Sequence, residues 1–312
     1  MHRRTFGRLL SSTLVLPMVR NLFGVEADGM PAVCIFSKHL QWLDYESMAE
    51  TAASLGFDGI DLTVRPGGHV EPEWVAEELP RACRAIRSAG LQVPTITTAV
   101  VDTSNPADLQ VLQAAADEGI SFYRMGYLRY EPGRSLDDLL ERARVQFAGL
   151  AEVNRQLGIC GDYQNHAGEG YLGASLWDLW HVLRDLDPRW IGCQFDLRHA
   201  TVEGTKSWPI DFRRLVDRVH TCVVKDFRWN EEAGTPEVEN RPLGEGVAEF
   251  DRFLPMLGET GFSGPMSLHF EYSLGGANHG ARELEMSQEV VESSMRRDLT
   301  TLKNWLAESG LS

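Results

Sequence analysis

Short apolar runs alternate with longer amphipathic stretches along most of the chain. From residue 32 onward, each run of about four to eight mainly apolar residues is typical of a buried strand, and the stretch after it has helical spacing. Glycine ends several of these helical stretches, as at Gly56. The expected strands are 32–36, 59–64, 93–100, 121–127, 159–166, 190–197, 221–227 and 265–272. The expected helices are 45–56, 73–90, 106–119, 135–158, 175–186, 212–219, 249–261 and 290–310.

This alternation predicts an α/β fold made of one closed barrel. Repeated strand–helix units need a parallel sheet with right-handed crossovers, and eight of them close most economically into a single (β/α)8 TIM barrel. An open doubly wound sheet is the alternative, and it calls for a glycine-rich phosphate-binding turn after an early strand. The segment GGH at 67–69 does not fit that fingerprint. No linker or low-complexity stretch interrupts the pattern, so we expect one barrel domain over residues 28–312.

The first residues resemble a twin-arginine export signal. Arg3-Arg4 stand before a modest apolar run at 9–19, and a plausible cleavage site follows Ala27. That run is shorter than the ~20 residues needed to cross a bilayer. We therefore expect residues 1–27 to be removed on export to the periplasm, with no membrane insertion afterwards. The alternative is a basic N-terminal helix that stays attached.

The net charge and the cysteine content exclude some classes of ligand and of covalent cross-link. The formal net charge is −15 and the pI is near 5.1, so the surface repels phosphate backbones and nucleic acid is not expected as a partner. A neutral sugar is not disfavoured by this charge. The five cysteines are odd in number and have no tight spacing, which argues against a disulfide framework and favours small buried side chains.

Polar and ionisable side chains follow the expected strands at the end where barrel enzymes carry their chemistry. Residues two apart in a strand face the same side, so Gln164 shares a face with His166, and His269 shares one with Glu271. A single histidine or aspartate at a strand end is usually a cap or a loop anchor, but polar ends on all eight expected strands favour a site. The substrate-binding candidates are Lys38, Arg65, His69, Arg124, Asn165, His199, Trp208, Asp226 and Trp229. The catalytic candidates are His166, Lys225, His269 and Glu271.

Two of these candidates, Trp208 and Trp229, point to a carbohydrate. Both come after strands that carry other candidate residues. The apolar CH faces of a sugar ring stack on aromatic side chains, while its hydroxyls need fixed donors and acceptors. We therefore expect a small-molecule carbohydrate as the partner.

The chain resembles the sugar phosphate isomerase/epimerase superfamily, whose members have a xylose-isomerase-like barrel. The resemblance covers residues 32–306, and it looks closest to an exported branch of the superfamily. It implies a sugar isomerase or epimerase, often a dimer or tetramer, although no motif decides the oligomeric state. The segments that carry it are GFDGIDLTVRPGGHV, YQNHAGE, QFDLRHA, VVKDF, PLGEG followed by EFDRF, and MSLHFEY.

The resemblance also implies a divalent metal at the mouth of the barrel, but the ligands depart from the usual set. Better-known members use Glu, Asp, His and Glu from strands five to eight. In this chain only Asp196 matches, while Gln164, Val223 and His269 stand at the other three positions. His220 lies three residues before Val223 and is expected to face the other way.

Two outcomes stay open. Zn, Mn or Co could bind through Gln164, Asp196 and His269, since imidazole and carboxylate suit these ions. Alternatively, the ammonium of Lys225 replaces the metal as the positive charge near a substrate oxygen.

The expected reaction is proton transfer on a sugar or an oxidised (keto) sugar. His166, His269 or Glu271 would act as acid and base, and imidazole suits this work near neutral pH. Isomerisation and epimerisation share an enediolate-like intermediate with elimination and hydration, so a lyase, hydratase or hydrolase of keto-sugar derivatives is an alternative. A non-enzymatic alternative is an exported sugar-binding protein on a decayed enzyme scaffold. An abasic-site nuclease, known from another branch of this barrel family, is disfavoured by the net charge.

Overall fold

The computed structural model describes residues 30–230, 234 and 236–311. The expected export signal at residues 1–27 lies outside the described residues. Within the described part of the chain, no helix is both long enough and apolar enough to cross a membrane.

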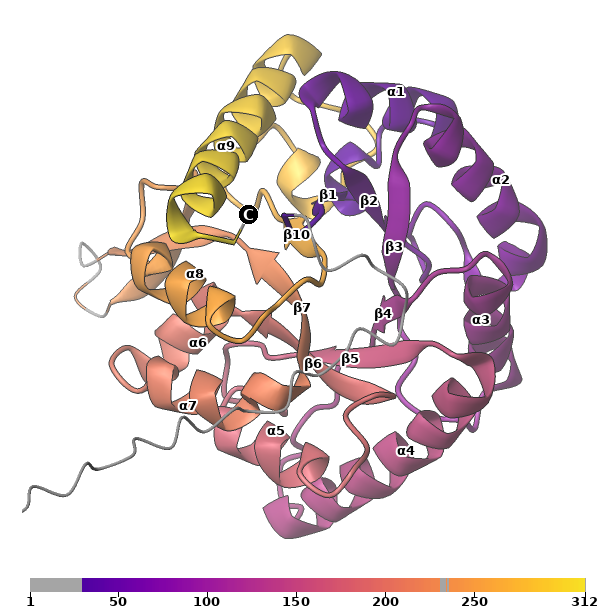
Figure 1. The fold of residues 1–312 in the computed structure, drawn as a ribbon, viewed down its shortest axis with the longest axis vertical. Helices are drawn as coiled ribbons and strands as arrows, with labels where there is room; N and C mark the ends of the chain where they lie inside the picture. Colours follow the sequence, from indigo (N-terminus) through magenta and orange to yellow (C-terminus); the bar gives the residue numbers. More distant parts are fainter. Residues whose placement is uncertain (1–29, 231–233, 235, 312) are drawn as a thin grey trace, which may run out of the picture.

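Eight parallel strands close into a barrel, with helices around it (Figure 1). Each neighbouring pair of strands is parallel, and the order around the barrel is β1-β10-β7-β6-β5-β4-β3-β2. The predicted (β/α)8 TIM barrel is therefore confirmed. Its strands are β1 Val33–Phe36, β2 Gly59–Thr63, β3 Gln92–Thr97, β4 Phe122–Arg124, β5 Cys160–Gln164, β6 Ile191–Asp196, β7 Val219–Val224 and β10 Met266–Leu268.

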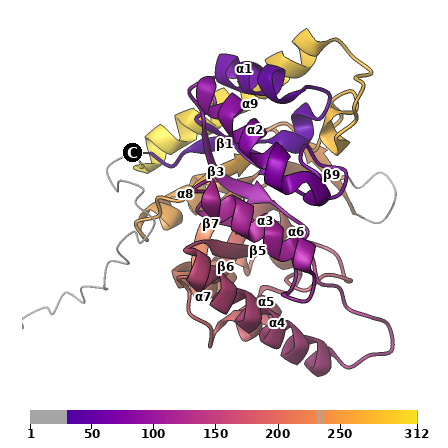
Figure 2. The ribbon, with the colours of Figure 1, turned by 90° about the vertical axis from the view of Figure 1, so that its right-hand side faces the viewer.

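The helices lie outside the strands (Figure 2), and their buried apolar residues belong to the same core cluster as those of the strands. Local sequence fixes where they begin and end: Asp44 accepts a hydrogen bond from Ser47 at the start of α1, and Gly56 ends that helix in the left-handed region. Ser135 caps α4 in the same way. The helices are α1 Tyr45–Leu55, α2 Val75–Ser88, α3 Pro106–Asp117, α4 Leu136–Leu157, α5 Leu176–Leu183, α6 Leu197–Gly204, α7 Trp208–Leu215, α8 Phe250–Gly258 and α9 Gln288–Ser309.

The structure differs from the predicted elements mainly after the sixth strand. Two short helices, α6 and α7, replace the single helix expected at 212–219. The strand expected at 221–227 ends at Val224, and the chain continues into an antiparallel hairpin of β8 Asp226–Asn230 and β9 Glu237–Arg241. The last barrel strand is also shorter than expected, so His269 and Glu271 follow its end.

A bulge in β7 changes the direction of one side chain. Cys193 pairs with Val219 and Gln194 pairs with Thr221, which leaves His220 as the extra residue between them. The His220 ring turns toward Asp162 of β5, with Nδ1 2.7 Å from Oδ1. His220 was expected to face away from the side of Val223, as it would in a regular strand. The bulge makes that expectation wrong.

Candidate active site at the mouth of the barrel

The carboxyl ends of four adjacent strands, β4 to β7, bring a row of polar side chains together. Arg124 donates to Oε1 of Gln164 at 3.0 Å, and Nε2 of Gln164 donates to Oδ2 of Asp196 at 2.8 Å. Tyr127 also donates to Oε1 of Gln164, at 2.5 Å. On the far side of Asp196, Nζ of Lys225 lies 3.1 Å from the same Oδ2. The donors on both sides therefore fix which end of the Gln164 amide faces Asp196.

Lys225 lies at the centre of this group. Its side chain is only 4% exposed. Besides Asp196, its ammonium contacts Nε2 of His199 at 2.9 Å and Oε2 of Glu271 at 3.3 Å. Burial of an ammonium is costly unless it is paired, and two carboxylates supply that pairing here.

The residues at the mouth do not fit a divalent metal. Oδ1 of Asp196 accepts from the backbone N–H of His199 at 3.0 Å, and Oδ2 accepts from Gln164 and Lys225. An ion on Oδ2 would have to displace these donors and stand beside the Lys225 ammonium, which would repel it. The amide oxygen of Gln164 is likewise occupied by Arg124 and Tyr127. The predicted ligand set of Gln164, Asp196 and His269 is therefore not supported by this geometry.

A possible metal-ligand group does exist elsewhere. Among the described residues, the one set of three or more His, Cys, Asp or Glu side chains whose ligand atoms lie within 4.8 Å of one another is Cys160, Asp162 and His220. These residues lie lower in the barrel, toward the amino-terminal ends of β5 and β7.

One imidazole nitrogen of His269 has no hydrogen-bond partner in the described structure. Its Nε2 lies 3.2 Å from Oγ of Ser267, and that hydroxyl donates to Oδ2 of Asp61 at 2.7 Å. Because the Ser267 proton is directed to Asp61, Nε2 of His269 carries the hydrogen and Nδ1 keeps a free lone pair. Nδ1 is buried with no hydrogen-bond partner among the described residues. Burial lowers the pKa of His269 from 6.5 to about 3, so the ring is neutral near pH 7.

Two further histidines line the mouth. The His166 ring packs 4.0 Å from the His199 ring, and its Nδ1 lies 2.8 Å from the carbonyl oxygen of Ala167. A carbonyl only accepts, so Nε2 of His166 is the nitrogen with the free lone pair. Burial, together with the Lys225 charge, lowers the pKa of both rings and keeps them neutral.

Glu271 is ionised between two lysines. Burial alone would raise the pKa of this carboxyl, but Lys225, the His269 ring and Lys38 together hold it well below its usual value. Oε2 faces Lys225, and Oε1 lies 3.7 Å from Nζ of Lys38. Oε1 is also 3.8 Å from Nδ1 of His269, which is too long for a hydrogen bond.

Phe36 forms an apolar surface at the bottom of the mouth, and it is not among the site residues predicted from the sequence. The His269 ring stacks on it at 4.3 Å with an interplanar angle of 17°. Three cationic groups lie over the same ring: Lys38 at 5.5 Å, Arg65 at 5.5 Å and Arg124 at 5.9 Å. Tyr127, Ser267 and Asp61 were missed as well, although the alternation of Ser267 with His269 is a signal that could have identified Ser267.

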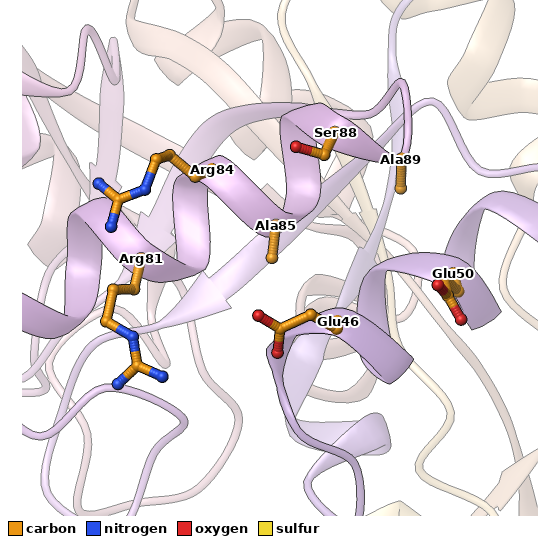
Figure 3. Close-up of a pocket in the computed structure, with 7 residues that line it drawn as sticks. All are labelled: Glu46, Glu50, Arg81, Arg84, Ala85, Ser88 and Ala89. Atoms are coloured by element: carbon orange, nitrogen blue, oxygen red, sulfur yellow. The ribbon is translucent and has the colours of Figure 1, made fainter.

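A pocket of about 410 Å³ opens beside this apolar surface. Lys38 and Arg65 line it, together with the glycine turns at 67–68 and at 280. Burial lowers the pKa of Lys38 to about 8 and that of Arg65 to about 10. Another pocket of about 410 Å³ lies outside the barrel between α1 and α2, and it is lined by Glu46 and Glu50 of α1 and by Arg81 and Arg84 of α2 (Figure 3). That groove is lined by exposed charged residues and by small side chains.

Three of the predicted substrate-binding residues form hydrogen bonds within the protein. The amide of Asn165 bonds both the N–H and the carbonyl of Asp196, which ties β5 to β6. Asp226 accepts backbone N–H groups of residues 227, 244, 246 and 248, so it anchors the loop after the hairpin. His69 contacts Thr63 and the carbonyl of Leu40. All three therefore support the strands and loops around the mouth.

Trp208 is the clearest correction. It begins α7, is 0% exposed, packs its ring against Phe253 of α8 and donates to Glu249. It is therefore a core residue, and its expected contact with a sugar is wrong. Trp229 lies on β8, half-buried beside Phe227, and its role stays a prediction.

Comparison with known proteins identifies the family. Residues 49–292 match the family described as xylose isomerase-like TIM barrel. The chain belongs to this family. A relative by sequence is the uncharacterized protein MJ1311 of Methanocaldococcus jannaschii, 22% identical over 177 residues, which are 56% of this chain and 56% of that protein. The match thus spans little more than half of the relative's length.

Solved structures share the fold at low sequence identity. The 3-keto-D-glucoside 4-epimerase YcjR from E. coli is 14% identical, with a TM-score of 0.64 over 88% of this chain and 99% of its own. D-Psicose 3-epimerase from Clostridium cellulolyticum H10 is 12% identical, with a TM-score of 0.66 over 88% and 99%. The IOLI protein, solved with a bound zinc atom, is 12% identical, with a TM-score of 0.66 over 89% and 98%. At these identities the likeness establishes the fold.

Proposed function

We propose that this chain is an isomerase- or epimerase-like enzyme that moves a proton on a sugar or an oxidised (keto) sugar at the mouth of the barrel. The observation that carries the proposal is the neutral His269 ring, whose unpartnered Nδ1 lies in the same cluster as the Lys225 ammonium. A base with a free lone pair and a fixed positive charge are the two groups that proton abstraction beside a carbonyl requires. The sugar epimerases among the structural neighbours support this reaction class.

Each residue has a role in this scheme. Nδ1 of His269 removes the proton, and the ammonium of Lys225 stabilises the negative charge that develops on the substrate oxygen. In this proposal, Nε2 of His166 exchanges the second proton. Asp61 and Ser267 hold the tautomer of His269 that leaves Nδ1 free, and Glu271 keeps Lys225 and Lys38 in place.

The charge of the mouth favours a substrate with an anionic group. Arg65 and Arg124 have no carboxylate within 4.0 Å among the described residues, whereas Lys38 and Lys225 do. Nε of Arg124 is buried and has no hydrogen-bond partner in the part of the chain that the structure describes. Asp61 lies deeper, bonded to Ser267 and Thr97. An excess of cations in a protein with a net charge of −15 indicates a sugar acid or a phosphorylated sugar.

Solvent exchange tests the reaction class. Incubation with candidate keto-sugars and sugar acids in D2O should place deuterium on the carbon next to the carbonyl, as seen by NMR, because every proposed outcome passes through the same proton abstraction. His269→Ala should abolish the exchange, while the exposed His181→Gln serves as the control. Saturable sugar binding without exchange or any product would instead favour the binding-protein alternative.

Arg65 tests the anionic substrate. Arg65→Gln should raise KM for a sugar acid by about tenfold or more and leave KM for the matching neutral sugar unchanged, since a charge-assisted hydrogen bond contributes roughly 1.5–3 kcal/mol. Equal effects on both sugars would show that Arg65 supports the pocket without recognising charge.

The cellular location is part of the proposal and rests on sequence alone. Residues 1–27 would direct the folded protein to the periplasm, which suits a fold with five free cysteines. Replacement of Arg3-Arg4 by two lysines should retain the protein in the cytoplasm on cell fractionation; unchanged export would exclude the twin-arginine route.

A further inference from the structure

The barrel contains a second group of chemically reactive side chains, away from the mouth. Sγ of Cys160 lies 3.2 Å from Nδ1 of His220, and that nitrogen lies 2.7 Å from Oδ1 of Asp162. The third side of the triangle, from Sγ to Oδ1, is 3.8 Å. The thiol and the carboxylate are buried, while the imidazole is 19% exposed.

Three independent features of the backbone bring these atoms together. Cys160 and Asp162 are two apart on β5 and therefore share a face. The bulge in β7 turns His220 toward them. Gly192 of β6 lies under the imidazole, and a Cβ atom there would stand 2.3 Å from its Cε1. Any side chain at Gly192 would fill the space that the ring uses.

Hydrogen bonds already link the three side chains through one carboxylate oxygen. Nδ1–H of His220 donates to Oδ1 of Asp162 at 2.7 Å, and the Cys160 thiol is directed at the same oxygen from 3.8 Å, so an ion at this place would take the position of these two protons. The remaining oxygen of Asp162 is already held by Thr221, whose hydroxyl donates to Oδ2 at 2.8 Å. Such an outer hydrogen bond is the kind that orients a carboxylate for a metal.

The triangle has the dimensions of a metal site. Sides of 3.2, 2.7 and 3.8 Å place one point about 1.9 Å from all three atoms, and a shift of about 1 Å out of their plane gives about 2.2 Å. Zinc prefers about 2.0–2.1 Å to nitrogen, about 2.0–2.2 Å to oxygen and about 2.3 Å to sulfur. A shift of a few tenths of an ångström by the thiol would complete the fit.

We infer that Cys160, Asp162 and His220 form a zinc-type metal site inside the barrel, separate from the mouth. A thiolate and a carboxylate carry two negative charges, which a divalent ion neutralises, so the occupied site is electrically balanced in a buried place. The mixed S, N and O ligand set suits tetrahedral Zn²⁺ or Co²⁺, with the fourth position taken by water. The exposed edge of His220 provides the entry path.

Loading the purified mature protein with Co²⁺ or Zn²⁺ alone tests this site without any sugar turnover. The protein is first stripped of metal with a chelator, and it is dialysed after loading to remove unbound ions. We then expect one equivalent of metal per chain by elemental analysis. The Co²⁺ form should show thiolate-to-cobalt charge-transfer absorption and the visible bands of a tetrahedral ion. A bound cobalt without the thiolate band would overturn the inference, and so would no binding at equimolar metal.

Variants locate the ion. Cys160→Ala should remove both the binding and the thiolate band, whereas Cys193→Ala, another buried cysteine, should leave them unchanged. Thr221→Val should weaken the affinity by about 10–100-fold because it frees the Asp162 carboxylate. Circular dichroism checks that each variant folds. Metal that survives Cys160→Ala but disappears in the mouth variant Asp196→Asn would place the ion at the mouth and refute this site.

Discussion

The ammonium of Lys225 lies 3.1 Å from Oδ2 of Asp196, the one metal-ligand position that matches the superfamily pattern. A buried carboxylate at this position needs a positive partner, and in this chain a side chain supplies it. The Gln164 amide, which stands where the resemblance places a Glu ligand, then donates a hydrogen bond to the same oxygen. Gln164 and Lys225 therefore act together on one oxygen of Asp196.

Removal of Lys225 should strongly destabilise the fold. Lys225→Met leaves the buried carboxylate of Asp196 unpaired, and breaking a buried ion pair in this way costs about 3–5 kcal/mol. Urea unfolding followed by circular dichroism measures the loss. The double variant Lys225→Met with Asp196→Asn should recover part of it, because no uncompensated charge remains at that pair. A single variant as stable as the parent would contradict the pairing.

Trp208 should matter for stability and not for sugar binding. Its ring is fully buried between α7 and α8, so Trp208→Ala should lower the free energy of unfolding by about 3–5 kcal/mol. KM for any active sugar should stay unchanged at a temperature where the variant is folded. Trp229→Ala is the matched comparison, since Trp229 is only half-buried on the hairpin. A raised KM in the Trp208 variant would restore its expected role in binding.

The barrel could be predicted from the sequence because its signal is repetitive. Each strand–helix unit carries its own period, and errors at single boundaries do not change the fold. The hairpin of β8 and β9 was missed because Phe227 follows the apolar end of β7 so closely that residues 221–227 were predicted as a single strand.

The site could be predicted as a set of strand ends but not as a set of contacts. Lys225, His269 and Glu271 were selected by position, and the structure brings them into one cluster. The prediction that Trp208 contacts a sugar failed because the exposure of a side chain depends on tertiary packing, which its position in the sequence does not reveal. His220 failed because one extra residue in β7 reverses the alternation, and a bulge has no clear local signature in this strand.

Acid should unfold this protein from below about pH 6.5. Burial lowers the pKa of five histidines in the folded state, to about 4 for His69 and about 3 for His269. The set is His39, His69, His166, His199 and His269. The unfolded chain protonates near the ordinary value of 6.5, so it binds more protons than the folded chain between that pH and the folded pKa values. Stability should therefore fall as pH falls through this window.

Urea unfolding at several pH values measures this slope. His269→Asn should make the loss between pH 6.5 and 4 shallower, because one buried group that resists protonation is gone. His181→Gln, at an exposed position, should leave the slope unchanged. A free energy of unfolding that is constant from pH 7 to 4 would show that these rings are not held neutral in the fold.

Lys38 should set the alkaline limit of binding to an anionic sugar. Burial lowers the pKa of its ammonium from 10.5 to about 8, although the nearby Glu271 opposes that shift. The side chain is therefore charged at pH 7 and loses its proton as the pH rises through about 8, and with it the attraction for an anion. KM for a sugar acid should rise above this pH, while KM for the matching neutral sugar stays flat.

Lys38→Arg should extend the plateau to higher pH, since a guanidinium keeps its charge. Lys38→Gln should raise KM for the sugar acid already at pH 7 and remove the alkaline change; an unchanged pH profile in Lys38→Gln would assign the alkaline limit to another group.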